Sequence, residues 1–439
     1  MQLPKIFLEE MQELLKEEFP AYIKSFEDES VQGIRVNTEK ISVEEFQRLA
    51  PFELEPVPWT DNGFYVRQKD QVSRHPYYFA GLYYVQEPSA MLPAATLNAQ
   101  PGDAVLDLCA APGGKATELG GRLGRKGILL ANDISHSRAK ALLKNLELAG
   151  VGNLMVSSAL PENLEAEYAG FFDKILIDAP CSGEGMFRKD PAMLKSYAEH
   201  GPQYYAKIQR EILKSAVPML KPGGKMVYST CTFSRLENEE TIRWILEDYP
   251  DMRLVPLGKD GVLRLFPHRV KGEGHFTAML EKTGEPVPEK EKTAVKKQTL
   301  PKEYEEFAAK YLNLQLEDWQ YRTIEDRLYA LPRDICIKGK IRYLRTGLLL
   351  GENKKKRFEP SQALAMFLKR SEVKSSISFA ADDGRVIRYL KGETIELTEA
   401  EEKGLLAWTL VCVDGFPLGW AKLVNGSLRN KYYAGWRMN

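Results

Sequence analysis

The chain has 439 residues, of which 44% are hydrophobic and 28% are charged, and its formal net charge at pH 7 is zero. This length predicts about two to four domains, and the composition excludes a chain that is disordered throughout. Because the opposite charges balance, a uniformly basic surface is also excluded, and any attraction for a polyanion has to be local.

The cysteines and the apolar segments indicate the cellular compartment. The five cysteines are dispersed and form no CxxC pair, which argues against a disulfide framework and against a structural zinc site. No apolar run reaches the roughly 18 residues that a membrane span requires. The first residues, MQLPKIFLEEMQ, lack the apolar segment of a secretion signal. We therefore expect a cytoplasmic protein with no metal and no membrane partner.

Residues 1–95 mix helix and strand signals and are predicted to form a small N-terminal α/β (RRM-like) module. A polar-rich helix pattern covers residues 7–19, and residues 33–37 are predicted to form a short strand. Residues 51–58 form a connection punctuated by prolines.

Residues 96–284 alternate strand and helix patterns. Strands separated by helices pair in parallel through right-handed crossovers, so this segment predicts an α/β fold with a doubly wound, Rossmann-like sheet. The expected strands are residues 104–108, 128–131, 154–156, 174–177, 225–229 and 276–280. Helices are expected after a cap at Ser135, over residues 205–220 and around residues 242–246, with a turn at Pro222, Gly223 and Gly224.

The C-terminal third is predicted to contain a linker and two modules. Residues 285–300 are rich in charge and proline, as linkers are. Residues 301–375 form an intermediate module, and residues 376–439 have the short strands and glycine turns of a small β-rich domain. From Lys338 to Lys374 the chain has eleven Lys or Arg against three Asp or Glu, including the run Lys354–Arg357. By itself such a run is more often a solvated loop than a binding site.

The segment from Asp107 to Lys115, DLCAAPGGK, follows the first strand and opens the next helix. Gly113 and Gly114 allow a sharp turn close to a ligand, at the position where doubly wound sheets bind ligands. The pattern is neither G-x-G-x-x-G nor a phosphate-binding loop. An adenosine ligand without a pyrophosphate fits better, with Asp133 after the second strand accepting hydrogen bonds from ribose.

Two cysteines and an acid follow the next two strands of the same sheet. Asp178 and Cys181 lie in DAPCSGEG after the fourth strand, and Cys231 lies in STCT after the fifth. Because parallel strands end at one edge, these side chains are expected to converge beside the cofactor loop. Cys109, Cys336 and Cys412 are interpreted as inert. The five histidines show no ligand spacing, and His268 and His275 are interpreted as surface or packing residues.

This set of groups suits methyl transfer to carbon 5 of a cytosine. That carbon is a poor nucleophile until a thiolate adds to carbon 6 of the ring. A carboxyl group near ring N3 and the exocyclic amine would orient the base and balance the charge that develops. A second thiol would serve in proton removal or elimination, and the base must be unstacked to enter the pocket.

At these residues the sequence resembles the Sun (Nol–Nop–Sun) family of RNA cytosine-5 methyltransferases. The matching segments are residues 35–38 (RVNT), 84–89 (YVQEPS), 107–115, 178–185, and 229–232 with Glu237 and Asn238. The resemblance implies that Cys231 is the nucleophile and that Cys181 assists as base or in product release. It also implies that S-adenosyl-L-methionine is held by Cys109, Ala110, Ala111, Pro112, Gly113, Gly114, Lys115, Asp133 and Asp178. Many members carry an acid that contacts the adenine, where this chain has Ser157, Ser158 and Ala159.

The C-terminal part is similar to one branch of that family, the RsmF-like bacterial ribosomal RNA enzymes. The matching segments are residues 345–351 with 354–360, and 415–422 followed by Asn430 and residues 435–437. The branch implies a PUA-like RNA-binding domain and 16S rRNA, or the small ribosomal subunit, as partner. Two alternatives stay open: the same chemistry on transfer RNA, and a non-catalytic ribosome-assembly factor that binds RNA on an inactive methyltransferase scaffold.

Overall fold

The computed structural model describes residues 3–190, 192–258, 260–285, 300–316, 319–333 and 337–438. Most of the predicted linker, residues 286–299, lies outside the described residues, and so does Cys336.

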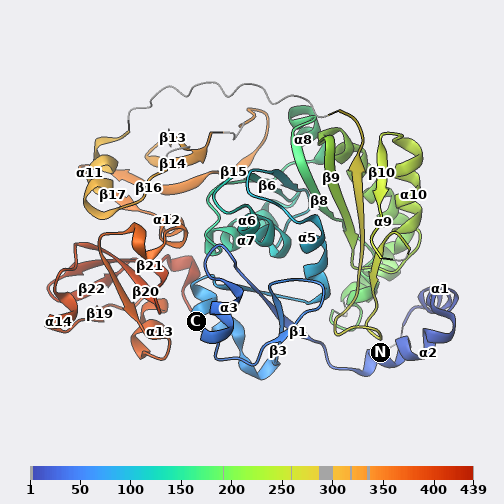
Figure 1. Ribbon diagram of the computed structural model, residues 1–439, viewed down its shortest axis with the longest axis horizontal. Helices are drawn as coiled ribbons and strands as arrows, with labels where there is room; N and C mark the ends of the chain where they lie inside the picture. Colours follow the sequence, from blue (N-terminus) through green and yellow to red (C-terminus); the bar gives the residue numbers. More distant parts are fainter. Residues whose placement is uncertain are drawn as a thin grey trace.

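A nine-stranded sheet forms the centre of the molecule (Figure 1). Its strands follow the order β10-β12-β9-β8-β5-β6-β7-β15, and β11 pairs with β12 outside this path. Strands β5 to β9 pair in parallel, and β12 pairs antiparallel with β9. The predicted Rossmann-like sheet is therefore confirmed. The bounds are β5 Ala104–Asp107, β6 Ile128–Asn132, β7 Leu154–Ser157, β8 Phe172–Asp178, β9 Leu220–Thr230, β10 Met252–Val255, β11 Leu263–Leu265, β12 His275–Lys282 and β15 Tyr343–Thr346.

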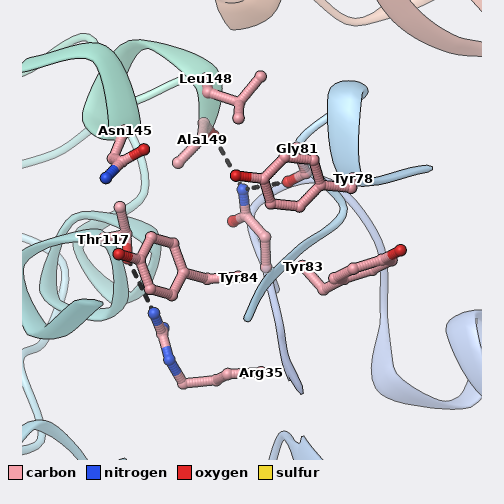
Figure 2. A pocket seen from close by; sticks show the side chains of 10 residues that line it. Arg35, Tyr78, Gly81, Tyr83, Tyr84, Thr117, Asn145, Leu148 and Ala149 are labelled. Carbon is pink, nitrogen blue, oxygen red and sulfur yellow. Dashed lines mark hydrogen bonds between the residues drawn. The ribbon is translucent and has the colours of Figure 1, made fainter. Parts of the chain in front are cut away.

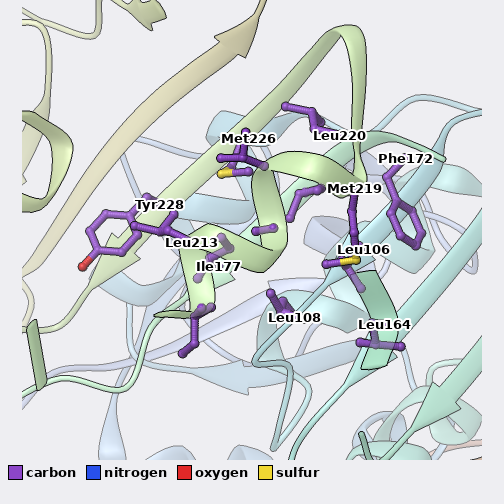
Figure 3. Close-up of a cluster of buried hydrophobic side chains, with 14 of the residues drawn as sticks. Leu106, Leu108, Leu164, Phe172, Ile177, Leu213, Met219, Leu220, Met226 and Tyr228 are labelled. Carbon is purple, nitrogen blue, oxygen red and sulfur yellow. The ribbon is translucent and has the colours of Figure 1, made fainter. Parts of the chain in front are cut away.

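Helices cover both faces of this sheet. Successive residues of a strand point to opposite faces, so Val105 and Leu106 of β5 enter different cores. Val105 packs with α5 (Leu92–Leu97), α6 (Gly114–Leu123) and α7 (His136–Leu148). Leu106 packs with α8 (Pro161–Tyr168), α9 (Ala192–Met219) and α10 (Glu239–Asp248), in the cluster that Figure 3 draws with Leu213 and Tyr228.

Two local predictions need correction. The helix expected over residues 7–19 ends at Leu15, where α1 (Lys5–Leu15) stops, and α2 (Phe19–Lys24) begins after a turn. Pro20 has no N–H to donate to the carbonyl of Lys16, so one continuous helix is disfavoured. The turn expected at residues 222–224 lies within β9, as a bulge: pairing with β8 passes from Leu220 directly to Lys225.

The N-terminal module has helices α1 and α2 followed by a four-stranded sheet. The sheet has the order β2-β3-β1-β4 and, with helices α3 and α4, packs beside α6 and α7. Helices α1 and α2 instead pack their aromatic residues against Phe187, Tyr197 and Phe233 near the cysteine segments. The bounds are β1 Gln32–Val36, α3 Val43–Leu49, β2 Glu55–Pro56, β3 Gly63–Val66, α4 Pro76–Phe79 and β4 Tyr83–Gln86.

The C-terminal part forms two small sheets, of orders β13-β14-β16-β17 and β18-β20-β21-β22-β19. The second sheet shares a hydrophobic core with the N-terminal module, and Tyr77 Oη donates to Asp414 Oδ2 at 2.8 Å between them. The bounds are α11 Lys302–Tyr311, β13 Trp319–Ile324, β14 Arg327–Pro332, β16 Leu348–Lys354, β17 Arg357–Pro360, α12 Gln362–Phe367, β18 Ser376–Phe379, α13 Gly384–Leu390, β19 Ile395–Glu396, α14 Glu399–Glu402, β20 Trp408–Val413, β21 Phe416–Val424 and β22 Ser427–Asn430.

Strand β15 joins the C-terminal part to the central sheet. It pairs antiparallel with β7, and Arg345 forms an ion pair with Glu147 of α7 at 2.5 Å. The predicted intermediate module therefore shares a sheet with the central fold, which no local pattern in residues 301–375 indicates.

Candidate active site

The segment from Cys109 to Lys115 follows β5 and runs into the first two residues of α6, and it is held by three side chains from other elements. Arg138 of α7 donates to the carbonyl of Ala111 at 2.7 Å, and Asn145 of α7 donates to that of Pro112 at 2.8 Å. Arg35 of β1 donates to the carbonyl of Gly114 at 2.7 Å. It also donates to Thr117 Oγ1 at 2.8 Å (Figure 2). The φ of Gly113 is +117°, a conformation that a residue with a Cβ rarely adopts. These contacts and the turn at Gly113 fix the shape of the segment.

Two buried acids lie at the strand ends beside this loop. Asp133 follows β6, is 3% exposed, and accepts a hydrogen bond from the N–H of Ser135 at 2.9 Å. Asp107 ends β5 and is fully buried, and among the described residues no side chain donates a hydrogen bond to its carboxylate oxygens. Burial raises the pKa of Asp107 to about 8, against the attraction of Lys115 and a backbone contact with Cys109. A buried acid with so few donors is uncommon in proteins.

The segment that lacks the expected adenine-binding acid is fixed by its neighbours. Asn132 accepts from the N–H of Ala159 at 3.0 Å and donates to the carbonyl of Ala159 at the same distance. The N–H of Ser158 donates to the carbonyl of Arg342, next to β15, at 3.1 Å. These backbone groups therefore already have partners within the protein.

The structure brings Cys181 and Cys231 together. Their sulfur atoms are 3.3 Å apart, although the residues follow different strands. The N–H of Gly185 donates to the carbonyl of Cys231 at 2.9 Å, and Glu184 accepts from the N–H of Phe233 at the same distance. Cys231 is partly exposed, whereas Cys181 is buried. The hydrogen bond with Cys231, together with burial, raises the pKa of Cys181 well above its ordinary value, so Cys181 stays a thiol at neutral pH.

Asp178 lies at the end of β8 with three polar partners. Its Oδ2 accepts from Lys115 Nζ at 2.6 Å, and its Oδ1 accepts from Ser229 Oγ at 2.9 Å. His275 Nε2 lies 3.3 Å from the same Oδ1. Although burial raises the pKa of Asp178, the charge of Lys115 and the contact with His275 outweigh it and hold this pKa well below its usual range. Asp178 is therefore a carboxylate at neutral pH.

Two residues of this site were not predicted as site residues. His275 is 2% exposed at the start of β12 and lies against Asp178, so it is a buried residue and not a surface one. The reason is the antiparallel return of β12 beside β9, which places His275 at the edge where Asp178 ends. The second residue is Asp107, the first residue of the loop motif. The feature of the sequence that indicates a site residue here is its position at the end of a buried strand.

Cys412 and Cys109 are the other cysteines that the structure describes. Cys412 is fully buried in β20, in line with its interpretation as inert. Cys109 lies in the cofactor loop, and burial raises its pKa well above the ordinary value. In the part of the chain that the structure describes, no group of three or more His, Cys, Asp or Glu side chains is arranged to hold a metal ion. No helix described here combines the length and apolar character that crossing a membrane requires.

Comparison with known proteins assigns the family. The model of the 16S rRNA methyltransferase RsmB/F family matches residues 94–281. Ribosomal RNA small subunit methyltransferase F of Enterobacter sp. (strain 638) is 34% identical over 475 residues, which cover 98% of this chain and 95% of that protein. The chain belongs to the RsmF family of 16S rRNA methyltransferases.

Other matches extend the RsmF assignment along the chain. Models of the RsmF N-terminal domain, first C-terminal domain and PUA domain match residues 3–88, 306–368 and 376–438. The protein of the same name from Erwinia tasmaniensis is 33% identical and covers 98% of this chain. The expected RsmF-like branch and the PUA-like domain are therefore confirmed.

Solved structures support the same fold. A methyltransferase homologue from Pyrococcus horikoshii has a TM-score of 0.57 and 31% identity, covering 64% of this chain and 95% of its own. NSun6 from the same organism, with SFG, has the same TM-score at 23% identity, covering 64% and 99%. This RsmF-family protein is an S-adenosylmethionine-dependent RNA methyltransferase.

Proposed function

We propose that this protein methylates carbon 5 of cytosine in 16S rRNA through a covalent bond between Cys231 and carbon 6 of the base. The observation that carries the proposal is the 3.3 Å approach of the Cys181 and Cys231 sulfurs, beside the Asp178 carboxylate and its Lys115 partner. A single thiol would suffice for a structural role, whereas a nucleophile with a second thiol in reach suits addition followed by elimination.

The residues around the DLCAAPGGK loop fit S-adenosylmethionine. Asp107, whose buried oxygens accept from no side chain among the described residues, is suited to the cationic amino group of its methionine part, and buried Asp133 is suited to its ribose hydroxyls. The loop from Cys109 to Lys115 would line the same site. When bound there, the cofactor supplies an electrophilic methyl group.

The residues of the site divide the work on the cytosine. Cys231, the more exposed thiol, gives its proton to solvent, and its sulfur then bonds to carbon 6 of the ring. Asp178 is ionised, so it accepts a hydrogen bond from the exocyclic amine and holds the base. Lys115 lies 2.6 Å from Asp178 and offers a positive charge where the ring becomes electron-rich. After methylation solvent takes the proton from carbon 5, and the electron pair of that C–H bond forms the double bond to carbon 6 as the bond from carbon 6 to Cys231 breaks. The Cys181 thiol donates a proton to the departing sulfur and regains one from solvent.

The test of this function is the modified nucleotide in cells. Bisulfite sequencing of 16S rRNA from cells with and without the protein should find a protected cytosine that is lost in the knockout. Protection that changes only in transfer RNA would support the tRNA alternative, which the small-subunit rRNA names of the relatives do not favour. Unchanged protection throughout, with no S-adenosylmethionine binding, would support the assembly-factor alternative.

The Cys181→Ala variant should still attack the base but release it slowly. Because Cys181 is held as a thiol next to Cys231, its loss removes the proton source for elimination. We expect turnover to fall by about 10²–10³-fold and an RNA–protein adduct to accumulate. Denaturing gel electrophoresis with labelled RNA measures the adduct. Normal turnover in this variant would remove Cys181 from the mechanism.

The basic run at residues 354–357 is only partly available to RNA. It forms the turn between β16 and β17, where Lys354 pairs with Glu352 at 2.5 Å and Arg357 pairs with Glu359 at 2.9 Å. Lys355 and Lys356 are exposed, and no ion pair is found for them among the described residues. We propose that these two lysines contact phosphates.

The variant with Lys355→Ala and Lys356→Ala should bind RNA more weakly and with less dependence on salt. Each lost phosphate contact lowers the slope of log K against log salt by about 1. Filter binding across a salt series measures this slope. Lys354→Ala with Arg357→Ala is the matched control, and its smaller effect is expected because these side chains are already neutralised. An unchanged slope in the variant with Lys355→Ala and Lys356→Ala would mean that the turn is exposed to solvent and does not contact phosphates.

Two further features are proposed. The first is the division of the chain into modules at residues 1–95, 96–284, 301–375 and 376–439, with a linker at 285–300. The second is a cytoplasmic location, which follows from the proposed ribosomal substrate.

A further inference from the structure

Glu237 is a fully buried carboxylate between the two cysteine segments and α9, and none of the steps above uses it. Its Oε2 accepts hydrogen bonds from the N–H of Ser182 at 3.0 Å and from Gln209 Nε2 at 2.8 Å. Its Oε1 accepts from Ser182 Oγ. A buried carboxylate with this many donors is a strongly directional anchor.

These donors connect Glu237 to both sides of Cys181. Ser182 follows Cys181 directly, and Gln209 also donates to the carbonyl of Pro180, which precedes it, at 2.9 Å. The same network reaches the second cysteine segment, because Ser182 Oγ lies 2.8 Å from Thr232 Oγ1. Thr232 follows Cys231. Both cysteine segments are therefore connected by hydrogen bonds to the Glu237 carboxylate.

The position of the Glu237 carboxylate matters because Cys181 and Cys231 act in the same reaction and need a fixed separation. A displacement of about 1 Å between reacting groups lowers a rate by about 10²-fold. The cysteine segments are loops, and without such ties their backbones would not hold a fixed separation. Burial raises the pKa of Glu237 to about 7, against the hydrogen bonds from Ser182. Keeping this side chain ionised at neutral pH therefore lowers the free energy of unfolding, and a residue with such a cost is expected to have a function.

We propose that Glu237 is a positioning residue that sets the distance between the Cys181 and Cys231 thiols through its hydrogen bonds to Ser182 and Gln209. This role rests on the function proposed above for the two cysteines. It does not require Glu237 to touch the base or the cofactor.

The test compares Glu237→Ala with Glu237→Gln. The amide can keep the network: its oxygen accepts from both N–H groups, and its NH₂ group donates to Ser182 Oγ. We expect Glu237→Ala to lower kcat by about 10²-fold with the KM for RNA changed less than about threefold, and Glu237→Gln to stay within about fivefold of the wild type. A normal kcat in Glu237→Ala, or an equal loss in both variants, would overturn the proposal.

A second measurement reports the thiol separation independently of catalysis. Diamide takes two hydrogens from adjacent thiols and leaves a disulfide, and peptide mapping measures the linkage between residues 181 and 231. Wild type and Glu237→Gln should form this linkage at similar rates, and Glu237→Ala about tenfold more slowly. Equal rates in all three would contradict the positioning role even if Cys231 proved not to be the nucleophile.

A milder variant covers the case in which Glu237→Ala does not fold. Gln209→Ala removes the tie to Pro180 and leaves the contacts between Glu237 and Ser182 in place. We expect a loss in kcat of about tenfold and slower disulfide formation, with S-adenosylhomocysteine binding unchanged. Full activity and wild-type disulfide formation in this variant would also count against the proposal.

Discussion

The Cys231→Ala variant is expected to lose methyl transfer by at least about 10⁴-fold, since it removes the nucleophile on which each later step depends. It should also form no covalent adduct with RNA that contains 5-fluorocytosine, in which fluorine blocks proton loss from carbon 5. The Cys181 sulfur, which lies 3.3 Å from that of Cys231 in the wild type, should not replace it, because Cys181 is buried and burial still raises the pKa of its thiol in the variant. Single-turnover transfer of a labelled methyl group measures the loss.

The control for this variant is Cys412→Ala. It removes another buried thiol, in β20, away from both cysteine segments, and should leave the transfer rate close to that of the wild type. S-adenosylhomocysteine binding should be retained in Cys231→Ala. Substantial methyl transfer by a folded Cys231→Ala protein would exclude Cys231 as the nucleophile.

The Asp178→Asn variant should lower kcat by about 10²–10⁴-fold, because the amide keeps the shape of the carboxylate but not its charge. Lys115 would then lose its ion pair, and the base would lose its anionic acceptor. Steady-state kinetics with RNA measures the change, and calorimetric titration of S-adenosylhomocysteine separates it from a loss of cofactor affinity.

Asp173→Asn is the matched control for Asp178→Asn. Asp173 lies on the same strand, β8, and also pairs with a lysine, Lys221, at 2.7 Å. It lies at the opposite end of the strand, where β8 begins, so its loss should affect stability more than kcat. Equal losses of kcat in the two variants would mean that Asp178 acts through the strand and not on the base.

The central sheet and most of the site are predictable from the sequence because both follow from local patterns. Asp107, Asp133 and Asp178 lie at the ends of short apolar strands or directly after them. Because parallel strands end at the same edge of a sheet, the strand pattern alone places these acids together. The same rule predicted that Cys181 and Cys231 would converge. The broken first helix was also predictable, since Pro20 is visible in the sequence.

The contacts made by antiparallel and edge strands were not predictable in this way. His275 reaches Asp178 only because β12 returns beside β9, and a register shift by one residue would turn its side chain to the other face. The pairing of β15 with β7 joins segments far apart in the chain, and no periodicity encodes it. Glu237 belongs to a segment that matches the Sun family, but nothing in the sequence indicates its donors, Ser182 and Gln209.

Mapping the RNA adduct tests the central claim most directly. Wild-type protein is incubated with S-adenosylmethionine and 5-fluorocytosine RNA, digested, and the peptide that carries the nucleotide is sequenced by mass spectrometry. We expect the nucleotide on the sulfur of Cys231, with a transferred methyl group on the base. A nucleotide attached to residue 181, or methylation of the RNA with no adduct at all, would contradict it.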